Sequence, residues 1–217
     1  MSIAVKICGI NTSLALDAAI KGGAAYVGFV FYPPSPRYWA PSAAGLLAAS
    51  VPKAVAKVGL FVNADDAAIA AALSALSLDF LQLHGSETPE RVSSVRRRFG
   101  LPVVKAIAVG TSADLAHTDL YREVADILLF DAHPPQRPGS LPGGNAVSFD
   151  RTLLAGRTFD FPWMLSGGLT PQNVAEAVRL TGAGIVDVSS GVEDRPGSKN
   201  PAKIAAFIAA AKQAVEN

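Results

Sequence analysis

The stretch PWMLSGGLTPQNVAEAVRL, residues 162–180, contains one complete strand, loop and helix. The short apolar run 162–165 is typical of a strand that is buried on both faces. A glycine-rich loop follows, and the pattern of 171–180 predicts a helix with Pro171 at its first position and Thr170 as its N-cap. A strand that leads directly into a helix is the repeating unit of proteins with a parallel sheet. The stretch therefore predicts an α/β fold.

The rest of the chain repeats this alternation. The other apolar runs are 4–7, 26–31, 56–62, 80–83, 103–106, 127–130 and 185–188. Helical patterns lie between them at 13–21, 64–76, 88–99 and 201–215, with shorter ones at 117–123 and 150–155. Pro201 after Asn200 repeats the predicted helix start. Eight such units in 217 residues come close to the usual (β/α)₈ barrel length of about 250. Since no change of composition marks a boundary, we predict a single (β/α)₈ TIM barrel over residues 1–217.

The charge of the chain gives no sign of a nucleic-acid partner. It has 19 basic and 18 acidic side chains and a formal net charge of +1. The basic tract Arg96 to Arg98 lies at the end of a predicted helix, where positive charge complements the helix dipole. We therefore expect no nucleic acid among its partners.

The chain also has no pattern typical of export, membrane insertion or metal binding. It begins without a basic segment followed by an apolar stretch and a cleavage site. No apolar run approaches the spanning length of about 18 residues, so we expect cytoplasmic localisation and no membrane partner. The one cysteine cannot form an intramolecular disulfide, and His84, His117 and His133 do not have zinc-ligand spacing. We expect no metal.

Two loops of small residues follow the seventh and eighth predicted strands. They contain Gly167 and Gly168 in the first loop, and Asp187, Ser189, Ser190 and Gly191 in the second. Glycine lets backbone amides approach an anion, and loops at these positions of a barrel often bind phosphate. The alternative is that a tight strand-to-helix turn simply requires glycine. Two such loops on adjacent strands favour a phosphate site, and we expect a side chain at Gly168 to intrude on the phosphate oxygens.

Two other strand ends carry groups that can transfer protons. Cys8 follows the first apolar run and Asp131 follows the sixth. In a ring of eight strands these two ends flank strands seven and eight, so a bound sugar phosphate would have its ring between a thiol and a carboxyl group. Paired acid and base catalysis requires such an arrangement. The alternatives are a buried structural thiol for Cys8 and a turn-capping role for Asp131.

Three more side chains are candidates for substrate binding. Arg37 ends the proline-stiffened loop that begins with Tyr32, and a fixed guanidinium can pair with a carboxylate through two parallel hydrogen bonds. A surface salt bridge is the alternative for Arg37. Gln82 alternates with leucines and can point into the barrel, and His84 follows at the strand end, either as a donor to the ligand or as a structural histidine.

The chain resembles the phosphoribosylanthranilate isomerase family over nearly its whole length. The segments that carry the resemblance are KICGI, GFVFYPPSPRYW, KVGLFVN, LQLHG, VKAI, LLFDAH, SGGLTPQNV and VDVSSGVEDRPGSKNPAKI. They occur in the family's order and at the same strand ends. Three positions differ, because His133, Ala146 and Arg151 stand where the family often has lysine, glycine and tryptophan.

The resemblance implies a function and a set of roles. The expected reaction is an Amadori rearrangement of a phosphoribosyl anthranilate in tryptophan biosynthesis, with a phosphosugar as the small-molecule substrate and no cofactor. Cys8 would be the general base, Asp131 the general acid, and Arg37 the group that recognises the anthranilate carboxylate. The phosphate would lie at Gly167, Gly168, Ser189, Ser190 and Gly191. The chain would work as a monomer or a homodimer.

Two other functions compete with this interpretation. The related histidine-pathway isomerase performs the same rearrangement on a substrate with two phosphates, and typically has aspartate at both catalytic positions. This chain has Cys8 at the base position, and its loop after the third strand carries Asp65 and Asp66 where a second phosphate would bind. A non-catalytic phosphosugar-binding barrel would keep the glycine loops but would not need the thiol, the acid and the arginine together.

Overall fold

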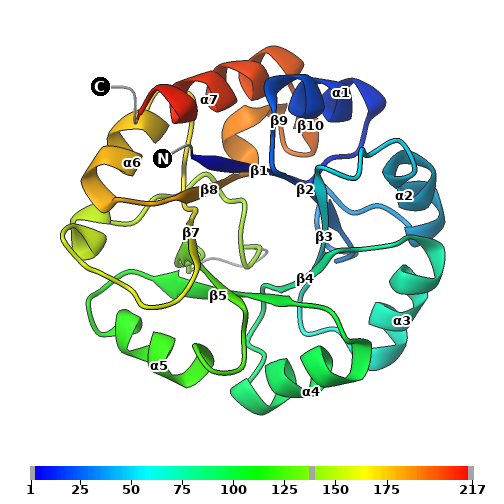
Figure 1. The fold of residues 1–217 in the computed structure, drawn as a ribbon, viewed down its shortest axis with the longest axis horizontal. Helices are drawn as coiled ribbons and strands as arrows, with labels where there is room; N and C mark the ends of the chain where they lie inside the picture. Colours follow the sequence, from blue (N-terminus) through cyan, green and yellow to red (C-terminus); the bar gives the residue numbers. More distant parts are fainter. Residues whose placement is uncertain (1–2, 137–139, 215–217) are drawn as a thin grey trace.

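Eight parallel strands close into a barrel in a computed structural model that describes residues 3–136 and 140–214. The strands are β1 (Ala4–Cys8), β2 (Tyr26–Val30), β3 (Ala56–Phe61), β4 (Phe80–Leu83), β5 (Val103–Val109), β6 (Ile127–Ala132), β7 (Trp163–Leu165) and β8 (Ile185–Val188). They are hydrogen-bonded in chain order, and β1 also pairs with β8 to close the ring. Figure 1 shows this ring enclosed by helices. The predicted (β/α)₈ TIM barrel is confirmed.

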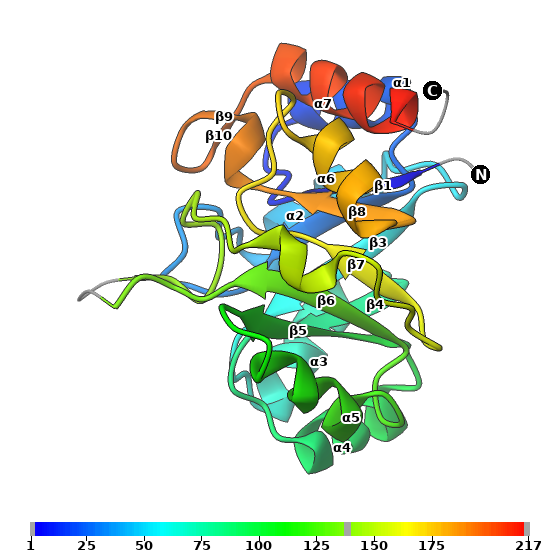
Figure 2. The same cartoon turned by 90° about the vertical axis from the view of Figure 1, so that its left-hand side faces the viewer.

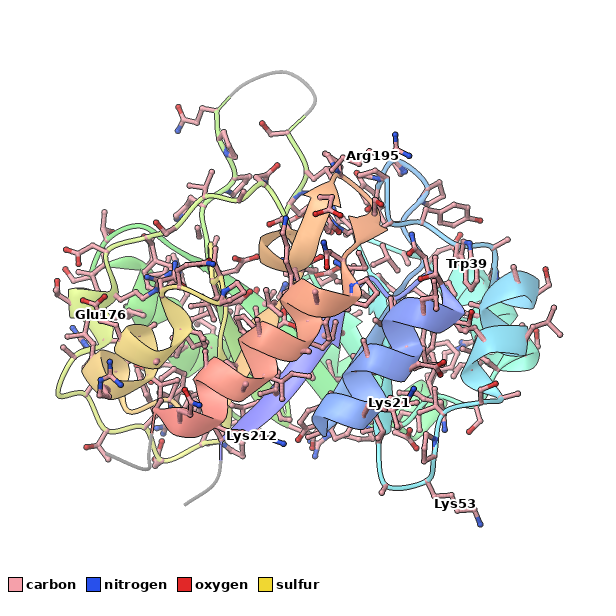
Figure 3. All side chains as sticks on the ribbon, turned by 90° about the horizontal axis from the view of Figure 1, so that it is seen from above. Lys21, Trp39, Lys53, Glu176, Arg195 and Lys212 are labelled. Atoms are coloured by element: carbon pink, nitrogen blue, oxygen red, sulfur yellow. The ribbon has the colours of Figure 1, made fainter. Side chains whose placement is uncertain are left out.

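The helices form an outer layer around the strands. They are α1 (Ser13–Gly22), α2 (Pro41–Ala48), α3 (Asp66–Ala75), α4 (Pro89–Phe99), α5 (Thr118–Tyr121), α6 (Val174–Thr181) and α7 (Pro201–Gln213), with 3₁₀ turns η1 (Asp114–His117), η2 (Arg151–Leu154) and η3 (Ser190–Val192). Figure 3 shows α1 and α7 side by side, where Nζ of Lys212 donates to the Gly22 carbonyl at 2.8 Å. Val215, the last residue of the predicted final helix, lies outside the described residues. Within those residues, no helix is both long and apolar enough to cross a membrane.

Polar side chains determine where several helices begin. Thr12, Asp65 and Thr88 each accept a hydrogen bond from a backbone N–H in the first turn of α1, α3 and α4. Such caps satisfy amides that have no partner within the helix. Gly23 and Gly100 end α1 and α4 in the left-handed conformation, which glycine adopts without steric cost.

The inside of the barrel is filled by alternate side chains of the strands. Val104, Ile127, Leu129 and Met164 form one buried cluster there. A second small cluster contains Cys8, Val30 and Leu60. The opposite faces of the strands pack against the helices in the large outer core. The thiol of Cys8 therefore lies over a packed interior and not over an open pore.

Two candidate catalytic residues lie in the strands themselves. Cys8 is the last residue of β1, and Asp131 is the last but one of β6. The sequence predicted that these strands end at residues 7 and 130, so each strand extends one or two residues further than predicted. A regular strand fixes the direction of its side chains better than a loop does. Figure 2 shows the long loop after β6 and the small hairpin of β9 and β10 projecting at the same end of the barrel.

The predicted start of the seventh-unit helix is wrong. Helix α6 begins at Val174, and Pro171 to Asn173 form a turn before it. The carboxamide of Asn173 accepts from the Thr170 N–H at 2.8 Å and donates to the Gly168 carbonyl at 3.0 Å, which holds this turn. Thr170 is therefore not the N-cap of α6. The same prediction is confirmed at α7, where the Asn200 side chain caps a helix that begins with Pro201.

One helix, one 3₁₀ turn and two strands have no counterpart among the predicted elements. They are helix α2, the turn η3 and the antiparallel pair β9 (Glu193–Arg195) and β10 (Ser198–Lys199), which follows β8. The pair is too short to give a periodic apolar pattern. It matters because Glu193 and Lys199 are both buried and reach into the site described below.

Candidate active site

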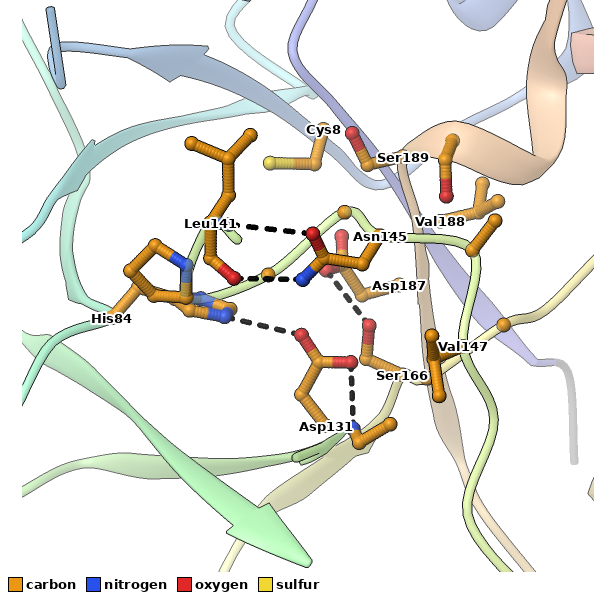
Figure 4. Close-up of a pocket in the computed structure, with 18 of the residues that line it drawn as sticks. Cys8, His84, Asp131, Leu141, Asn145, Val147, Ser166, Asp187, Val188 and Ser189 are labelled. Carbon is orange, nitrogen blue, oxygen red and sulfur yellow. Dashed lines mark hydrogen bonds and ion pairs between the residues drawn. The ribbon is translucent and has the colours of Figure 1, made fainter. Parts of the chain in front are cut away.

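A cavity opens at the carboxyl ends of the barrel strands (Figure 4). The predicted site residues that line it are Cys8, Arg37, His84, Asp131, Gly167, Gly168, Asp187, Ser189, Ser190 and Gly191. Gln82 does not line the cavity but lies fully buried behind His84. The loop after β6 adds residues from Leu141 to Val147 to the wall. The fold thus brings the predicted residues together in one place.

Cys8 and Asp131 lie on opposite sides of this cavity, as Figure 4 shows. Cys8 is only 3% exposed, yet its side chain lines the cavity wall. Asp131 is buried to a similar degree, and its backbone neighbour Ala132 donates a hydrogen bond to Oδ1 at 2.9 Å. A molecule bound between them would contact a thiol on one face and a carboxyl group on the other.

A buried ion pair lies directly below the thiol. Lys6 precedes Cys8 by two residues, so both side chains point into the barrel, and Nζ of Lys6 lies 2.9 Å from Oδ1 of Asp187. Ser166 also approaches the other oxygen of Asp187, at 3.5 Å. Sequence patterns did not single out Lys6, although a lysine inside an otherwise apolar strand is a usable signal, because charged side chains are rarely buried without a partner.

Opposing influences act on the Cys8 thiol. Burial raises the pKa of the thiol, since it disfavours the charged thiolate, and the nearby Asp187 carboxylate adds to this effect. The Lys6 and Lys199 ammonium groups act in the other direction and lower it. The net effect is a raised thiol pKa in the unliganded site.

His84 connects Gln82 to Asp131. The amide nitrogen of Gln82 lies 2.8 Å from Nδ1 of His84, and Nε2 of the same ring lies 3.1 Å from Oδ2 of Asp131. When the Gln82 amide donates to Nδ1, the neutral ring carries its proton on Nε2 and donates it to the carboxyl group. A methyl group at Gly143 would come 2.5 Å from Nε2 and 2.9 Å from Oδ2, so the loop after β6 covers this contact closely.

Arg37 is held rigidly by groups that the sequence did not identify. Its Nε and Nη2 atoms each lie 2.8 Å from a different carboxylate oxygen of Glu193, and Nη2 also donates to the Gly144 carbonyl at 3.1 Å. Lys199 donates to the same Glu193 at 2.7 Å and to the Ser189 carbonyl at 2.8 Å. The alternative of a surface salt bridge is wrong, because both side chains of the Arg37 pair are nearly inaccessible.

The charges in this cluster support one another. Burial opposes the ionised form of Glu193, but hydrogen bonds from Arg37 and the charge of Lys199 outweigh it and lower the pKa of the carboxyl group. Burial lowers the pKa of the Lys199 ammonium. Arg37 is thus fixed at the edge of the cavity, and two of its three nitrogens are already bonded within the protein.

The glycine loops meet closely at the side of the cavity next to β7 and β8. Gly167 and Gly168 have φ values of +82° and +61°, which L side chains rarely adopt. A side chain on Gly191 would collide with the Leu169 carbonyl. A Cβ on Gly168 would come within 2.9 Å of Ser148, so a side chain there would strike the loop after β6. Its intrusion on the phosphate oxygens stays a prediction.

Comparison with known proteins agrees with this geometry. The family model of N-(5'phosphoribosyl)anthranilate (PRA) isomerase matches residues 5–210. The N-(5'-phosphoribosyl)anthranilate isomerase of Paramagnetospirillum magneticum is 57% identical over 98% of both chains. This chain belongs to the phosphoribosylanthranilate isomerase family. The crystal structure of the Thermotoga maritima isomerase is 37% identical, covers 97% of this chain and 99% of its own, and superposes with a TM-score of 0.86.

A second solved isomerase of the family carries a ligand. That protein is 35% identical, covers 97% of this chain and 99% of its own with a TM-score of 0.82, and is in complex with reduced 1-(o-carboxyphenylamino)-1-deoxyribulose 5-phosphate. The ligand combines an aromatic carboxylate, an opened sugar and a phosphate.

The residues that differ from the phosphoribosylanthranilate isomerase pattern lie in the segment that joins β6 to β7. Arg151 donates through Nη2 to the Gly167 carbonyl at 2.9 Å, so it holds the first glycine loop. Ala146 has a φ of +56°, a conformation that favours the glycine usual at this position. His133 lies 3.3 Å from Asp114, away from the contact between His84 and Asp131. Arg151 and His133 thus contact other groups than Cys8 and Asp131.

Proposed function

We propose that this chain isomerises N-(5'-phosphoribosyl)anthranilate to 1-(2-carboxyphenylamino)-1-deoxyribulose 5-phosphate, a step of tryptophan biosynthesis, within one catalytic domain. The observation that supports this most is that Cys8 and Asp131 face each other across one cavity beside the two glycine loops. Cytoplasmic localisation, a monomeric or homodimeric state and the absence of a cofactor stay predictions from the sequence.

The substrate would lie across the cavity with its phosphate at the loops after β7 and β8. Backbone amides of Gly167, Gly168 and Gly191, with Ser189 and Ser190, suit a dianion there. The anthranilate carboxylate would then reach Arg37, whose Nη1 atom points toward the loop at Gly144 and has no partner among the described residues. This orientation leaves the ribose ring between Asp131 and Cys8.

Proton transfer by these two groups accounts for the reaction. Asp131 gives its proton to the ring oxygen, the bond between that oxygen and C1′ breaks, and the ring opens to a protonated Schiff base. The Cys8 thiolate then removes the proton from C2′, and the electron pair left behind neutralises the iminium nitrogen to give the enolamine. The enolamine relaxes to the aminoketone by taking a proton at C1′ and releasing the proton of its C2′ hydroxyl, so that the carbonyl forms at C2′. The reaction therefore needs a protonated carboxyl group and an ionised thiol at the same time.

A histidine-pathway isomerase would need a second phosphate site, and the loop after β3 does not suit one. Asp65 caps helix α3, and Asp66 pairs with Arg91 and, at 3.2 Å, with Arg98. Carboxylates whose partners are already in place offer nothing to a second phosphate, which they would repel. A substrate with a single phosphate fits the site better.

Turnover of the substrate by the purified protein tests the proposal. Anthranilate, phosphoribosyl pyrophosphate and the preceding transferase generate the substrate in place, and its fluorescence should decay when this protein is added. Cys8→Ala should fold normally and lower kcat by at least about 10²-fold, because no other base lies near C2′. Binding of the reduced product analogue without any turnover would instead support a non-catalytic phosphosugar-binding barrel.

A further inference from the structure

The proposed base, Cys8, is buried where its ionised form is unfavourable. Cys8 is 3% exposed, and a thiol so buried disfavours the thiolate that proton abstraction requires. The apolar neighbours Val30 and Leu60 give it no hydrogen-bond donor. A fixed positive charge close to Sγ would meet this requirement.

Lys6 places such a charge beneath the thiol. Its side chain is wholly inaccessible and points to the same side of β1 as Cys8. Both groups converge on Gly28 of the neighbouring strand, where a Cβ would come 3.0 Å from Sγ of Cys8 and 3.4 Å from Nζ of Lys6. The absence of a side chain at Gly28 is what leaves room for the two groups to approach each other.

Asp187 fixes the direction of the ammonium group. Its Oδ1 lies 2.9 Å from Nζ of Lys6, so the lysine cannot move away from the thiol without breaking a buried ion pair. Burial opposes the charged form of Lys6, but the Asp187 carboxylate and the thiol outweigh it and raise the pKa of the ammonium group. Lys6 therefore keeps its proton through the neutral range.

The other charged groups near Cys8 come from several elements. Lys199 on β10 favours the thiolate, and Asp187 on β8 opposes it. Lys199 is itself bonded to Glu193. Asp131 and His84 stand across the cavity. Among these groups Lys6 is the cation on the same strand and the same face as Cys8, with no loop between them.

We propose that Lys6 is a positioning residue for the reaction, whose ammonium group, oriented by Asp187, stabilises the thiolate of Cys8. This rests on the proposed role of Cys8 as the base. The thiol proton leaves to solvent before substrate binds, the C2′ proton later moves to Sγ, and Lys6 exchanges no proton at any step. The alternative is that Lys6 and Asp187 form an ion pair that only supports the fold.

The single cysteine of the chain allows a direct test. The rate of alkylation by iodoacetamide, measured against pH, reports the ionisation of Cys8 alone. In Lys6→Met we expect the midpoint of this profile to rise by about one pH unit or more, so that alkylation at a fixed pH below both midpoints slows by about tenfold. The acid limb of the kcat/KM profile should move in the same direction.

Lys105→Met is the matched control. Lys105 is also buried in a strand and paired with a carboxylate, Glu87, at 2.8 Å, but it points away from the barrel interior. The Lys105→Met substitution should destabilise the protein and leave the alkylation midpoint of Cys8 unchanged. If Lys6→Met does not fold, Lys6→Met combined with Asp187→Asn removes both buried charges. Because Asp187 itself disfavours the thiolate, the midpoint of this double variant is compared with that of Asp187→Asn alone and should be higher.

Two outcomes would overturn the proposal or separate it from the proposed function. An unchanged midpoint in a folded Lys6→Met protein, or a double variant with the same midpoint as Asp187→Asn alone, would show that Lys6 only supports the fold. A raised midpoint together with full turnover by Cys8→Ala would keep the coupling of Lys6 to the thiol and refute the role of Cys8 as the base. Alkylation thus tests Lys6 without relying on activity.

Discussion

As the proposed general acid, Asp131 must donate a proton, which makes its carboxyl group directly testable by substitution. Asp131→Asn keeps the shape and can still accept from the Ala132 N–H. The amide cannot protonate the ring oxygen, so we expect kcat to fall by about 10²- to 10⁴-fold, with a much smaller change in KM. Steady-state kinetics of the folded variant measure this. A raised KM with kcat preserved would make Asp131 a binding or turn residue.

The sequence predicted the candidate catalytic residues at the strand ends, but not the ion pairs that fix the side chains of the site. Cys8 and Asp131 each interrupt a short apolar run, and that signal is local. The partners of the site come from distant parts of the chain: Lys6 and Asp187 are 181 residues apart, and Arg37 and Glu193 are 156 apart. No local pattern relates such pairs. The ion pairs that support the site could therefore be identified only from the structure of the closed barrel.

At the scale of single elements, the long loop after β6 contains a conformation that its residue does not favour. Ala146 has a φ of +56°, where a Cβ is unfavourable. Ala146→Gly should therefore raise the free energy of unfolding by up to about 1 kcal/mol, since relief of this strain exceeds the entropy cost of glycine. Thermal or urea unfolding measures it.

A second alanine in the same region provides the control. Ala155, which follows η2, has a φ of −61°, a conformation that alanine adopts freely. Ala155→Gly should lower the free energy of unfolding by about 0.5–1 kcal/mol, because only the entropy cost remains. Equal losses in both variants would mean that the conformation of Ala146 stores no strain.

Two helix starts show where a local sequence signal predicts the structure correctly and where it does not. Asn200 followed by Pro201 predicts the start of α7 correctly, because the Asn200 side chain is free to accept from Ala202 and Lys203. Thr170 followed by Pro171 carries a similar signal, yet the carboxamide of Asn173 binds the Thr170 N–H and delays α6 by three residues. The difference arises from a competing side chain that a dipeptide signal does not include.

For the molecule as a whole, the repeated alternation was sufficient to predict the barrel. Runs such as 26–31 and 127–130 are apolar on both faces, which only a sheet covered by helices outside and packed side chains inside can bury. The hairpin of β9 and β10 was not predictable in this way, because two or three residues carry no period. It nevertheless determines how Arg37 is held, through Glu193 and Lys199.

The free energy of unfolding should decrease at low pH, because several carboxylates of the fold are then protonated. Glu193 and Glu87 have pKa values below their ordinary value of 4.5, because buried cations and hydrogen bonds outweigh the effect of burial. Hydrogen bonds from the backbone of the loop after β5 lower the pKa of Asp114 to about 2. A group whose pKa is lower in the folded state stabilises it above the unfolded pKa, and this contribution is lost as the pH falls through the folded value.

We therefore expect the free energy of unfolding, measured in urea, to begin falling near pH 4.5 and to continue falling toward pH 2. Glu193→Gln should be less stable at pH 7, because Lys199 and Arg37 lose a buried counter-charge, and its stability should fall less steeply with acid than that of the unmodified protein. Asp194→Asn, next in the chain but exposed and paired with Lys203, should change both properties much less, since solvent screens that pair. If Glu193→Gln lost stability between pH 4.5 and 2 as steeply as the unmodified protein, the carboxylate that holds Arg37 would not be a source of the acid sensitivity.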